Sequence, residues 1–235
     1  MELAAGAVFL QCEVMEPEQI QIRAVFFDSG RVSMRVLDQP TASSAQTLQQ
    51  ALISSKAIAG CNGGYYKLNG LGVYGLQISD GLVQGEVGNV SDLEAALLVR
   101  SGILRIERAK GLVNDGTLTQ MVQCSPMLVE KGVQVFSATG SDEPRVSRTF
   151  AVSDDRGHWV IGTAERATLS GLARLLVREN LFPNFRAVTA MNLDGGPSSA
   201  FWCVTPQGEV REFRKNVKVR NYIGLFPREV EPVRR

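Results

Sequence analysis

The fold is decided by residues 159–193, WVIGTAERATLSGLARLLVRENLFPNFRAVTAMNL. Apolar runs at 159–163 and 187–193 each predict a strand. Between them, five apolar residues recur at helical spacing: Leu169, Leu172, Ala173, Leu175 and Leu176. Thr168 can cap this helix at its N-terminus, and Pro183 prevents its continuation. The segment therefore predicts a strand–helix–strand unit within a larger sheet.

Outward from this unit, the chain consists mostly of short β-type runs separated by turns that contain glycine. Tight turns are expected at 79–81 and 130–132, and a hairpin turn at 205–208. A second, shorter helix is expected over about 44–54. The sequence thus predicts an α+β or mixed α/β fold, organised as a β-rich single domain over 1–235 with a central mixed sheet and a few flanking helices.

Composition narrows the functional class. Of 235 residues, 44% are hydrophobic and 21% charged, which excludes a disordered chain. The formal net charge of +1 argues against a nucleic-acid or anionic-membrane surface. No apolar run approaches the ~20 residues that a membrane-spanning helix requires. The oligomeric state is left open.

The four cysteines lie far apart, so there is no CxxC zinc or redox motif, and buried free thiols are favoured over disulfides. His158 is the only histidine, which excludes a metal centre built on several histidines.

Two motifs lack the neighbouring secondary structure that their usual function requires. GLGVYG at 70–75 is followed by a β-type run rather than a helix, which excludes a dinucleotide site. GPSSA at 196–200 resembles a nucleophile elbow, but a hairpin follows it, so a serine hydrolase using Ser198 and His158 is disfavoured.

Two Gly-Gly turns, AGCNGGYY at 59–66 and MNLDGGPSS at 191–199, each follow an apolar run that ends in a polar side chain. Paired glycines let the backbone approach a ligand closely, and their amides can bind an anion. Partial burial at the end of a strand raises the pKa of a carboxylate such as Asp194. A third candidate is Arg148 with Thr149, a guanidinium and a hydroxyl suited to phosphate oxygens. Each motif alone also fits an ordinary turn or strand entry.

In this order, the segments resemble the phosphodiester glycosidase family, whose pattern is A-x-N-G-G-[FY]-[FY], G-L-x-I-x-x-G, P-x-L-V-x-x-G, R-T-A-x-G and a helix leading to L-D-G-G-x-S-S. They stand here at 59–66, 75–81, 126–132, 148–152 and 168–199, and the resemblance is strongest over 56–226. Ser153 and Pro197 replace glycines of the family pattern, and Cys61 replaces an aliphatic residue.

The resemblance implies hydrolysis of a sugar-1-phosphodiester, such as a GlcNAc-1-phosphodiester, at the anomeric carbon. Asp194 would be the nucleophile or general base, Arg148 would hold the phosphate, Asn62 would orient substrate oxygens, and Glu165 would be a second carboxylate. The resemblance further implies these substrate-binding residues: Gly63, Gly64, Tyr65, Tyr66, Thr149, Asn192, Gly195, Gly196, Ser198 and Ser199.

The sequence assigns no cofactor, although Asp194, Asn62 and Asn192 together offer oxygens suited to Ca²⁺ or Mg²⁺. The alternative is a non-catalytic module that binds phosphoglycans or other carbohydrates on the same scaffold. Family members usually act outside the cytoplasm. We therefore expect an exported protein, periplasmic, secreted or lumenal, whose leader is absent from this chain, acting on a small-molecule or glycan phosphodiester of the cell envelope or an exopolysaccharide.

Overall fold

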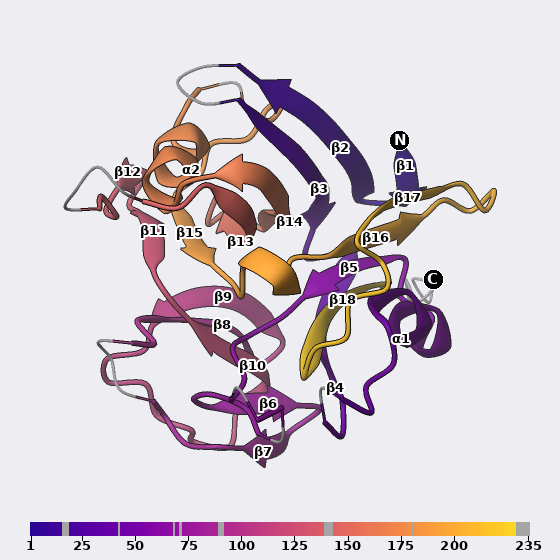
Figure 1. The fold of residues 1–235 in the computed structure, drawn as a ribbon, viewed down its shortest axis with the longest axis vertical. Helices are drawn as coiled ribbons and strands as arrows, with labels where there is room; N and C mark the ends of the chain where they lie inside the picture. The colour runs from indigo at the N-terminus through magenta and orange to yellow at the C-terminus, as the bar shows by residue number, and fades with distance from the viewer. Residues whose placement is uncertain are drawn as a thin grey trace, which may run out of the picture.

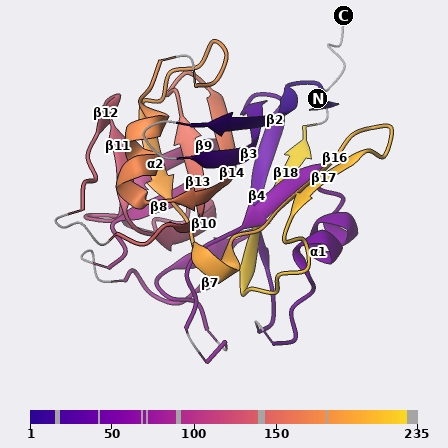
Figure 2. The ribbon, with the colours of Figure 1, turned by 45° about the horizontal axis from the view of Figure 1, so that its top comes forward.

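The computed structural model describes residues 1–15, 19–41, 43–67, 69–70, 72–88, 92–138, 143–179 and 181–228. In this part of the chain the strands form three sheets arranged around a shared interior, with two short α-helices on the outside (Figure 1). Figure 2 shows the same arrangement with the upper part of the molecule brought forward. Neither described helix has the length and hydropathy needed to span a membrane.

The first sheet has eight strands in the order β1-β2-β3-β14-β13-β15-β11-β12. Buried positions alternate with partly exposed ones along its outer strands, as expected where one face is solvated. The strands are β1 (Glu2–Ala4), β2 (Ala7–Val14), β3 (Ile20–Asp28), β14 (His158–Ala167), β13 (Val146–Ser153), β15 (Thr189–Asn192), β11 (Met127–Glu130) and β12 (Val133–Gln134).

The predicted mixed sheet with flanking helices is wrong. The strand–helix–strand unit exists as β14, α2 (Leu169–Leu176) and β15, but both strands pair antiparallel with β13, which lies between them. The two strands therefore run in the same direction without being neighbours, and every strand pairing in the described residues is antiparallel. The protein is β-rich rather than mixed α/β, because a strand from an earlier segment occupies the place that a parallel partner would take.

The two other sheets have five strands each. The second, in the order β7-β6-β10-β8-β9, contains β7 (Leu82–Gln84), β6 (Gln77–Ser79), β10 (Leu118–Cys124), β8 (Ala95–Arg100) and β9 (Ile103–Arg108). The third, in the order β17-β16-β5-β18-β4, contains β17 (Val210–Phe213), β16 (Phe201–Val204), β5 (Ala59–Asn62), β18 (Asn221–Pro227) and β4 (Val32–Asp38). The expected turns and hairpin separate β6 from β7, β11 from β12, and β16 from β17.

One apolar cluster draws fully buried side chains from all three sheets, including Phe27 of β3, Leu97 of β8 and Ile223 of β18. The sheets are therefore packed on a common core, which fixes the ends of β5 and β15 relative to each other. All four cysteines are free, as predicted, and three of them are buried.

Both helices begin at side-chain caps. Thr47 and Gln50 form a capping box at the start of α1 (Leu48–Ser55), and Thr168 accepts the Gly171 N–H at 2.9 Å at the start of α2, as the sequence predicts. The apolar face of α2 packs over β11, β14 and β15 and covers one side of the first sheet.

Candidate active site

The two Gly-Gly turns lie against each other at the ends of β5 and β15. The side chain of Asn62 donates from Nδ2 to the main-chain oxygen of Asp194 at 2.6 Å, and the Asp194 N–H donates to the Gly63 oxygen at 3.1 Å. These reciprocal bonds join segments 132 residues apart in sequence. The structure thus brings together two of the residues that the sequence singled out.

Asn62 itself is fully buried. Its Oδ1 accepts from the Thr149 hydroxyl at 2.7 Å and from the Ala200 N–H at 3.1 Å. The Thr149 hydroxyl also lies 3.2 Å from that of Ser199. With its carboxamide committed in this way, Asn62 positions the Asp194 turn from below and does not reach into open space.

Asp194 is partly exposed and stands at the wall of a cavity. Burial raises the pKa of its carboxyl to about 6, although hydrogen bonds from Ser198 and from the Gly195 N–H, 2.8 Å from Oδ1, act in the opposite direction. The group is therefore mostly ionised at pH 7, but it is more basic than an ordinary aspartate. That combination suits a nucleophile or general base.

The cavity has a volume of about 720 Å³. Its lining residues are Tyr65, Tyr66, Lys67, Tyr74, Asp194, Gly195, Pro197 and Ser198. Tyr65 is held by a 2.6 Å hydrogen bond from its hydroxyl to the Ser125 oxygen, and burial raises the pKa of this hydroxyl, so it stays neutral. Lys67 and Tyr74 were missed by the sequence analysis. The signal for Tyr74 was its place in a glycine-rich sequence, and a bridge between Tyr66 and the preceding residue Val73 brings it to the cavity.

Arg148 lies beside the second Gly-Gly turn. Its Nε donates to the Ala167 oxygen at 3.2 Å and its Nη2 to the Pro144 oxygen at 2.8 Å. Within the described residues Nη1 has no hydrogen-bond partner, and a Cβ placed on Gly195 would lie 3.8 Å from it. Burial lowers the pKa of the guanidinium, with the charge of Glu143 opposing the shift. The result is a cation held by two main-chain oxygens, without an ion pair to any described residue, next to the turn that carries Asp194.

Arg148 adjoins the Gly195 turn and is not itself among the residues that line the cavity, and two other candidates lie outside the cavity. Glu165 forms an ion pair with Arg23 and does not line the cavity. His158 begins β14 and binds Asp154, with 2.7 Å between Nδ1 and Oδ2. It is six residues, or roughly 20 Å of strand, from Ala164, which pairs with Arg148. The structure therefore does not assemble a triad from Ser198 and His158.

The remaining candidates support the turns. Asn192 donates from Nδ2 to the Ser125 oxygen at 2.8 Å, and its own oxygen is buried without a partner in the described part of the chain. The Gly64 N–H donates to Oδ1 of Asn221 at 2.6 Å. Asn221 was missed because it opens a strand that carries no turn signal. Gly196 starts a short 3-10 turn over Gly196–Ser198 with a φ of +60°, which favours glycine.

Only some of the residues predicted to bind Ca²⁺ or Mg²⁺ have a free oxygen for the ion. The oxygen of Asn62 is taken by two donors, and no cluster of three His, Cys, Asp or Glu side chains able to hold a metal ion occurs among the described residues. Binding of Ca²⁺ or Mg²⁺ through Asp194 and Asn192 stays a prediction.

Comparison with known proteins identifies the family of the chain. The sequence model of the phosphodiester glycosidase family matches residues 55–226, which include both Gly-Gly turns and Arg148. The chain belongs to the phosphodiester glycosidase family. Phosphodiester glycosidases are hydrolases, so this membership identifies the general class of the protein. No curated protein sequence matches it significantly.

Solved structures share the fold of this phosphodiester glycosidase at low identity. One is the catalytic domain of zebrafish N-acetylglucosamine-1-phosphodiester alpha-N-acetylglucosaminidase, auto-inhibited by its pro-peptide. It has a TM-score of 0.71 and 14% identity, over 94% of this chain and 83% of that one. A hypothetical protein from Synechocystis has a TM-score of 0.65 and 17% identity, over 96% and 63%. A candidate exported protein from Burkholderia pseudomallei K96243 has a TM-score of 0.56 and 12% identity, over 89% and 74%.

The contact of the first Gly-Gly turn with Asn221 gives a direct test by substitution. A Cβ on Gly63 would lie 2.0 Å from Oδ1 of Asn221, which must keep its place to bind Gly64. We expect Gly63→Ala to lower the free energy of unfolding by about 2–3 kcal/mol through overpacking, measured by urea denaturation. The control is Gly72→Ala, whose Cβ would meet only the flexible Lys67 side chain at 3.4 Å. Equal stability of the two variants would contradict the prediction.

Proposed function

We propose that this phosphodiester glycosidase cleaves a sugar-1-phosphodiester, such as a GlcNAc-1-phosphodiester, at the anomeric carbon, releasing free sugar and a phosphomonoester. The observation that carries the proposal is the pairing, at one turn, of a carboxylate whose pKa is raised to about 6 with a guanidinium that lacks an ion pair in the described structure. The name of the zebrafish protein of the same fold supports the choice of substrate class.

The chemistry follows from the charges. As the bond between the anomeric carbon and oxygen breaks, its electron pair passes to the phosphate oxygen and positive charge develops on the sugar ring. Ionised Asp194 stabilises or captures that cation, or removes a proton from the attacking water. The phosphate leaves with little need for protonation, but its negative charge must be held. Nη1 of Arg148 and the amide of Gly196 are candidate donors for this charge beside the turn, whereas the Gly195 amide already donates to Asp194.

The tyrosines would hold the sugar. Tyr65 and Tyr66 line the cavity wall together with Tyr74, and aromatic side chains offer flat apolar surfaces to a sugar ring. Glu165 has no part in this mechanism, because its carboxylate pairs with Arg23 away from the cavity. Asn62 contributes by holding the Asp194 turn in place.

Turnover is the decisive test. Purified protein would be incubated with the methyl ester of GlcNAc-1-phosphate, with UDP-GlcNAc and with a teichoic-acid-like polymer, and the released reducing sugar would be measured. If the protein is a glycosidase, we expect free sugar from at least one of these diesters. Saturable binding with no release of sugar would instead support a non-catalytic phosphoglycan-binding module.

Replacement of Arg148 tests the phosphate site. We expect Arg148→Met to lower kcat/KM for the cleaved diester about 10²–10³-fold, because a preorganised charge near the leaving group is lost. Arg148→Lys should recover part of that loss, because lysine restores the positive charge but not the paired planar donors of the guanidinium. Arg105→Met, which removes an exposed arginine of β9, is the control and should behave as wild type. Unchanged kinetics in Arg148→Met would remove this residue from the mechanism.

We also propose that the protein acts outside the cytoplasm on an envelope or exopolysaccharide phosphodiester. The candidate exported protein of the same fold supports this location. Fractionation of the source cells with an antibody against the folded protein would test it, and recovery only with cytoplasmic markers would contradict it.

A further inference from the structure

A second polar pocket lies at the end of the first sheet opposite the candidate active site. From Thr189 at the start of β15 to Asp194 is five residues, or roughly 17 Å of strand. The pocket has a volume of about 550 Å³ and Phe185 and Val188 supply its apolar lining. Its polar residues come from the β11–β12 turn, the β13–β14 turn and the segment between α2 and β15. We call it the basic pocket.

Three cations line the basic pocket, one from each of these segments: Lys131, Arg156 and Arg186. All three side chains are exposed, and within the described residues none has an ion pair or a side-chain hydrogen bond. Lys131 also adopts a left-handed backbone conformation, with a φ of 51°, which is uncommon for residues other than glycine, asparagine and aspartate. Like charges from three separate segments thus line one pocket, and no ion pair within the described residues neutralises them.

The pocket has two carboxylates, and one of them is already engaged. Asp154 is 8% exposed. Its Oδ1 accepts from the backbone N–H groups of Arg156 at 2.8 Å and His158 at 3.0 Å, and its Oδ2 lies 2.7 Å from the His158 ring. Asp154 therefore stabilises its own turn. Glu179, an exposed side chain, is the remaining carboxylate, so the cations are in excess.

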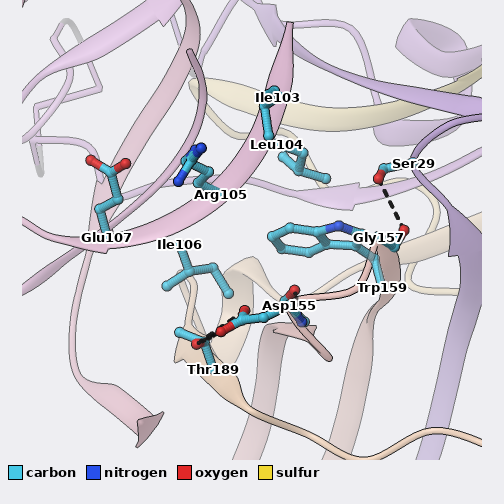
Figure 3. Close-up of a pocket in the computed structure, with 11 residues that line it drawn as sticks. Ser29, Ile103, Leu104, Arg105, Ile106, Glu107, Asp155, Gly157, Trp159 and Thr189 are labelled. Carbon is cyan, nitrogen blue, oxygen red and sulfur yellow. Dashed lines mark hydrogen bonds between the residues drawn. The ribbon is translucent and has the colours of Figure 1, made fainter. Parts of the chain in front are cut away.

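The cavity on the other side of the β13–β14 turn has more carboxylates than cations. It has a volume of about 350 Å³ and is lined by the carboxylates of Glu107 and Asp155 and by one arginine, Arg105. Figure 3 shows these side chains together with Trp159. The hydroxyl of Thr189 donates to Asp155 there at 3.4 Å. Successive residues of the β13–β14 turn thus line different cavities, and the excess of positive charge is confined to the basic pocket.

We propose that the basic pocket binds a phosphate monoester group as a site separate from the catalytic turn. A phosphate monoester is close to a dianion at neutral pH and has three terminal oxygens, which three independent cationic donors can share. Guanidinium groups are suited to this because their planar donors match two oxygens at once. The Phe185 wall can accept an apolar substituent of the ester.

The test uses phenyl phosphate as the probe and the full chain carrying Arg148→Met, so that the candidate active site does not contribute a phosphate site. Isothermal titration calorimetry at low salt should show saturable binding. Adding Arg156→Gln and Arg186→Gln should weaken it at least about tenfold, since each charge-assisted contact contributes at that level. Arg105→Gln, in the cavity on the other side of the turn, is the matched control and should leave the affinity unchanged.

Two further arms separate the outcomes. Phenyl sulfate, a monoanion of the same shape, should bind more weakly than phenyl phosphate if the charge of the ester matters. Circular dichroism melting should show that the variants remain folded. Absence of saturable binding, equal binding by the Arg156→Gln, Arg186→Gln variant, or an equal loss in Arg105→Gln would overturn the proposal. Since no sugar phosphodiester is present, failure of the proposed glycosidase activity would not affect this result.

Discussion

Asp194→Asn is expected to abolish turnover of the sugar phosphodiester and to make the protein more stable above pH 6. An amide is neither a nucleophile nor a base, so kcat should fall by at least roughly 10³-fold. In the wild type, activity that needs the ionised carboxylate should decline as the pH falls through about 6, the pKa that burial gives Asp194. Retained turnover in the variant would remove Asp194 from the catalytic role.

The stability gain follows from the direction of the pKa shift. The folded protein raises the pKa of Asp194 from 3.8 to about 6, so the folded state binds the proton more tightly than the unfolded state does. The resulting stabilisation is fully present below pH 4 and is lost as the pH rises through 6. Above that pH the wild type keeps a buried charge at a cost of about 3 kcal/mol at most, which Asp194→Asn removes.

Thermal melting across pH would measure this effect. We expect Tm of Asp194→Asn to exceed that of the wild type at pH 8, by roughly 2–4 °C for each kcal/mol gained, and the difference to vanish near pH 4. The control is Asp115→Asn, because Asp115 is exposed and hydrogen bonds from Thr117 hold the pKa of its carboxyl below the usual value. That variant should show no gain at pH 8. A difference for Asp194→Asn that does not change with pH would contradict the electrostatic explanation.

Asn62→Ala is expected to be among the most destabilising single substitutions in this protein. It would leave the main-chain oxygen of Asp194 and the Ala200 N–H without their partner, and it would deprive the Thr149 hydroxyl of the closer of its two acceptors. Each unsatisfied buried group costs about 1–3 kcal/mol, so the free energy of unfolding should fall by about 3–5 kcal/mol. Turnover should fall as well, because the turn that carries Asp194 loses its anchor.

Urea denaturation and kinetics on the same preparation would check both effects. Asn114→Ala is a suitable control, because Asn114 is exposed and only accepts a 3.3 Å bond from the Gly116 N–H. Its effect should be below about 0.5 kcal/mol. If Asn62→Ala kept wild-type stability but lost activity, Asn62 would act on the substrate directly, as the sequence analysis expected.

Features set by neighbouring residues could be predicted from the sequence. The Thr168 cap, the apolar face of α1 and the hairpin turns depend on side chains within a few positions of one another. The sheet topology could not be predicted in this way. Whether β15 lies beside β14 or beside β13 depends on contacts between distant segments, and the local pattern of strand, helix and strand is the same in both cases.

In the candidate site, too, some features could be predicted from the sequence, and others depend on contacts between distant segments. The two Gly-Gly motifs indicated that Asn62 and Asp194 belong to one place, and the structure brings them together. The sequence did not show that Asn62 lies beneath the turn, because burial is a property of the assembled sheets. Glu165 appeared suitable as a free carboxylate, but Arg23, which pairs with it, lies 142 residues away on a different strand.

The order of strands in the third sheet has a consequence for synthesis. β18 is the last of the strands in the described residues, yet it lies inside its sheet, between β5 and β4, and its Asn221 binds Gly64. While the ribosome is still translating the preceding segments, β5 lacks this neighbour, and the first Gly-Gly turn lacks one of its anchors. The first Gly-Gly turn therefore gains this anchor only after residue 227 has emerged from the ribosome.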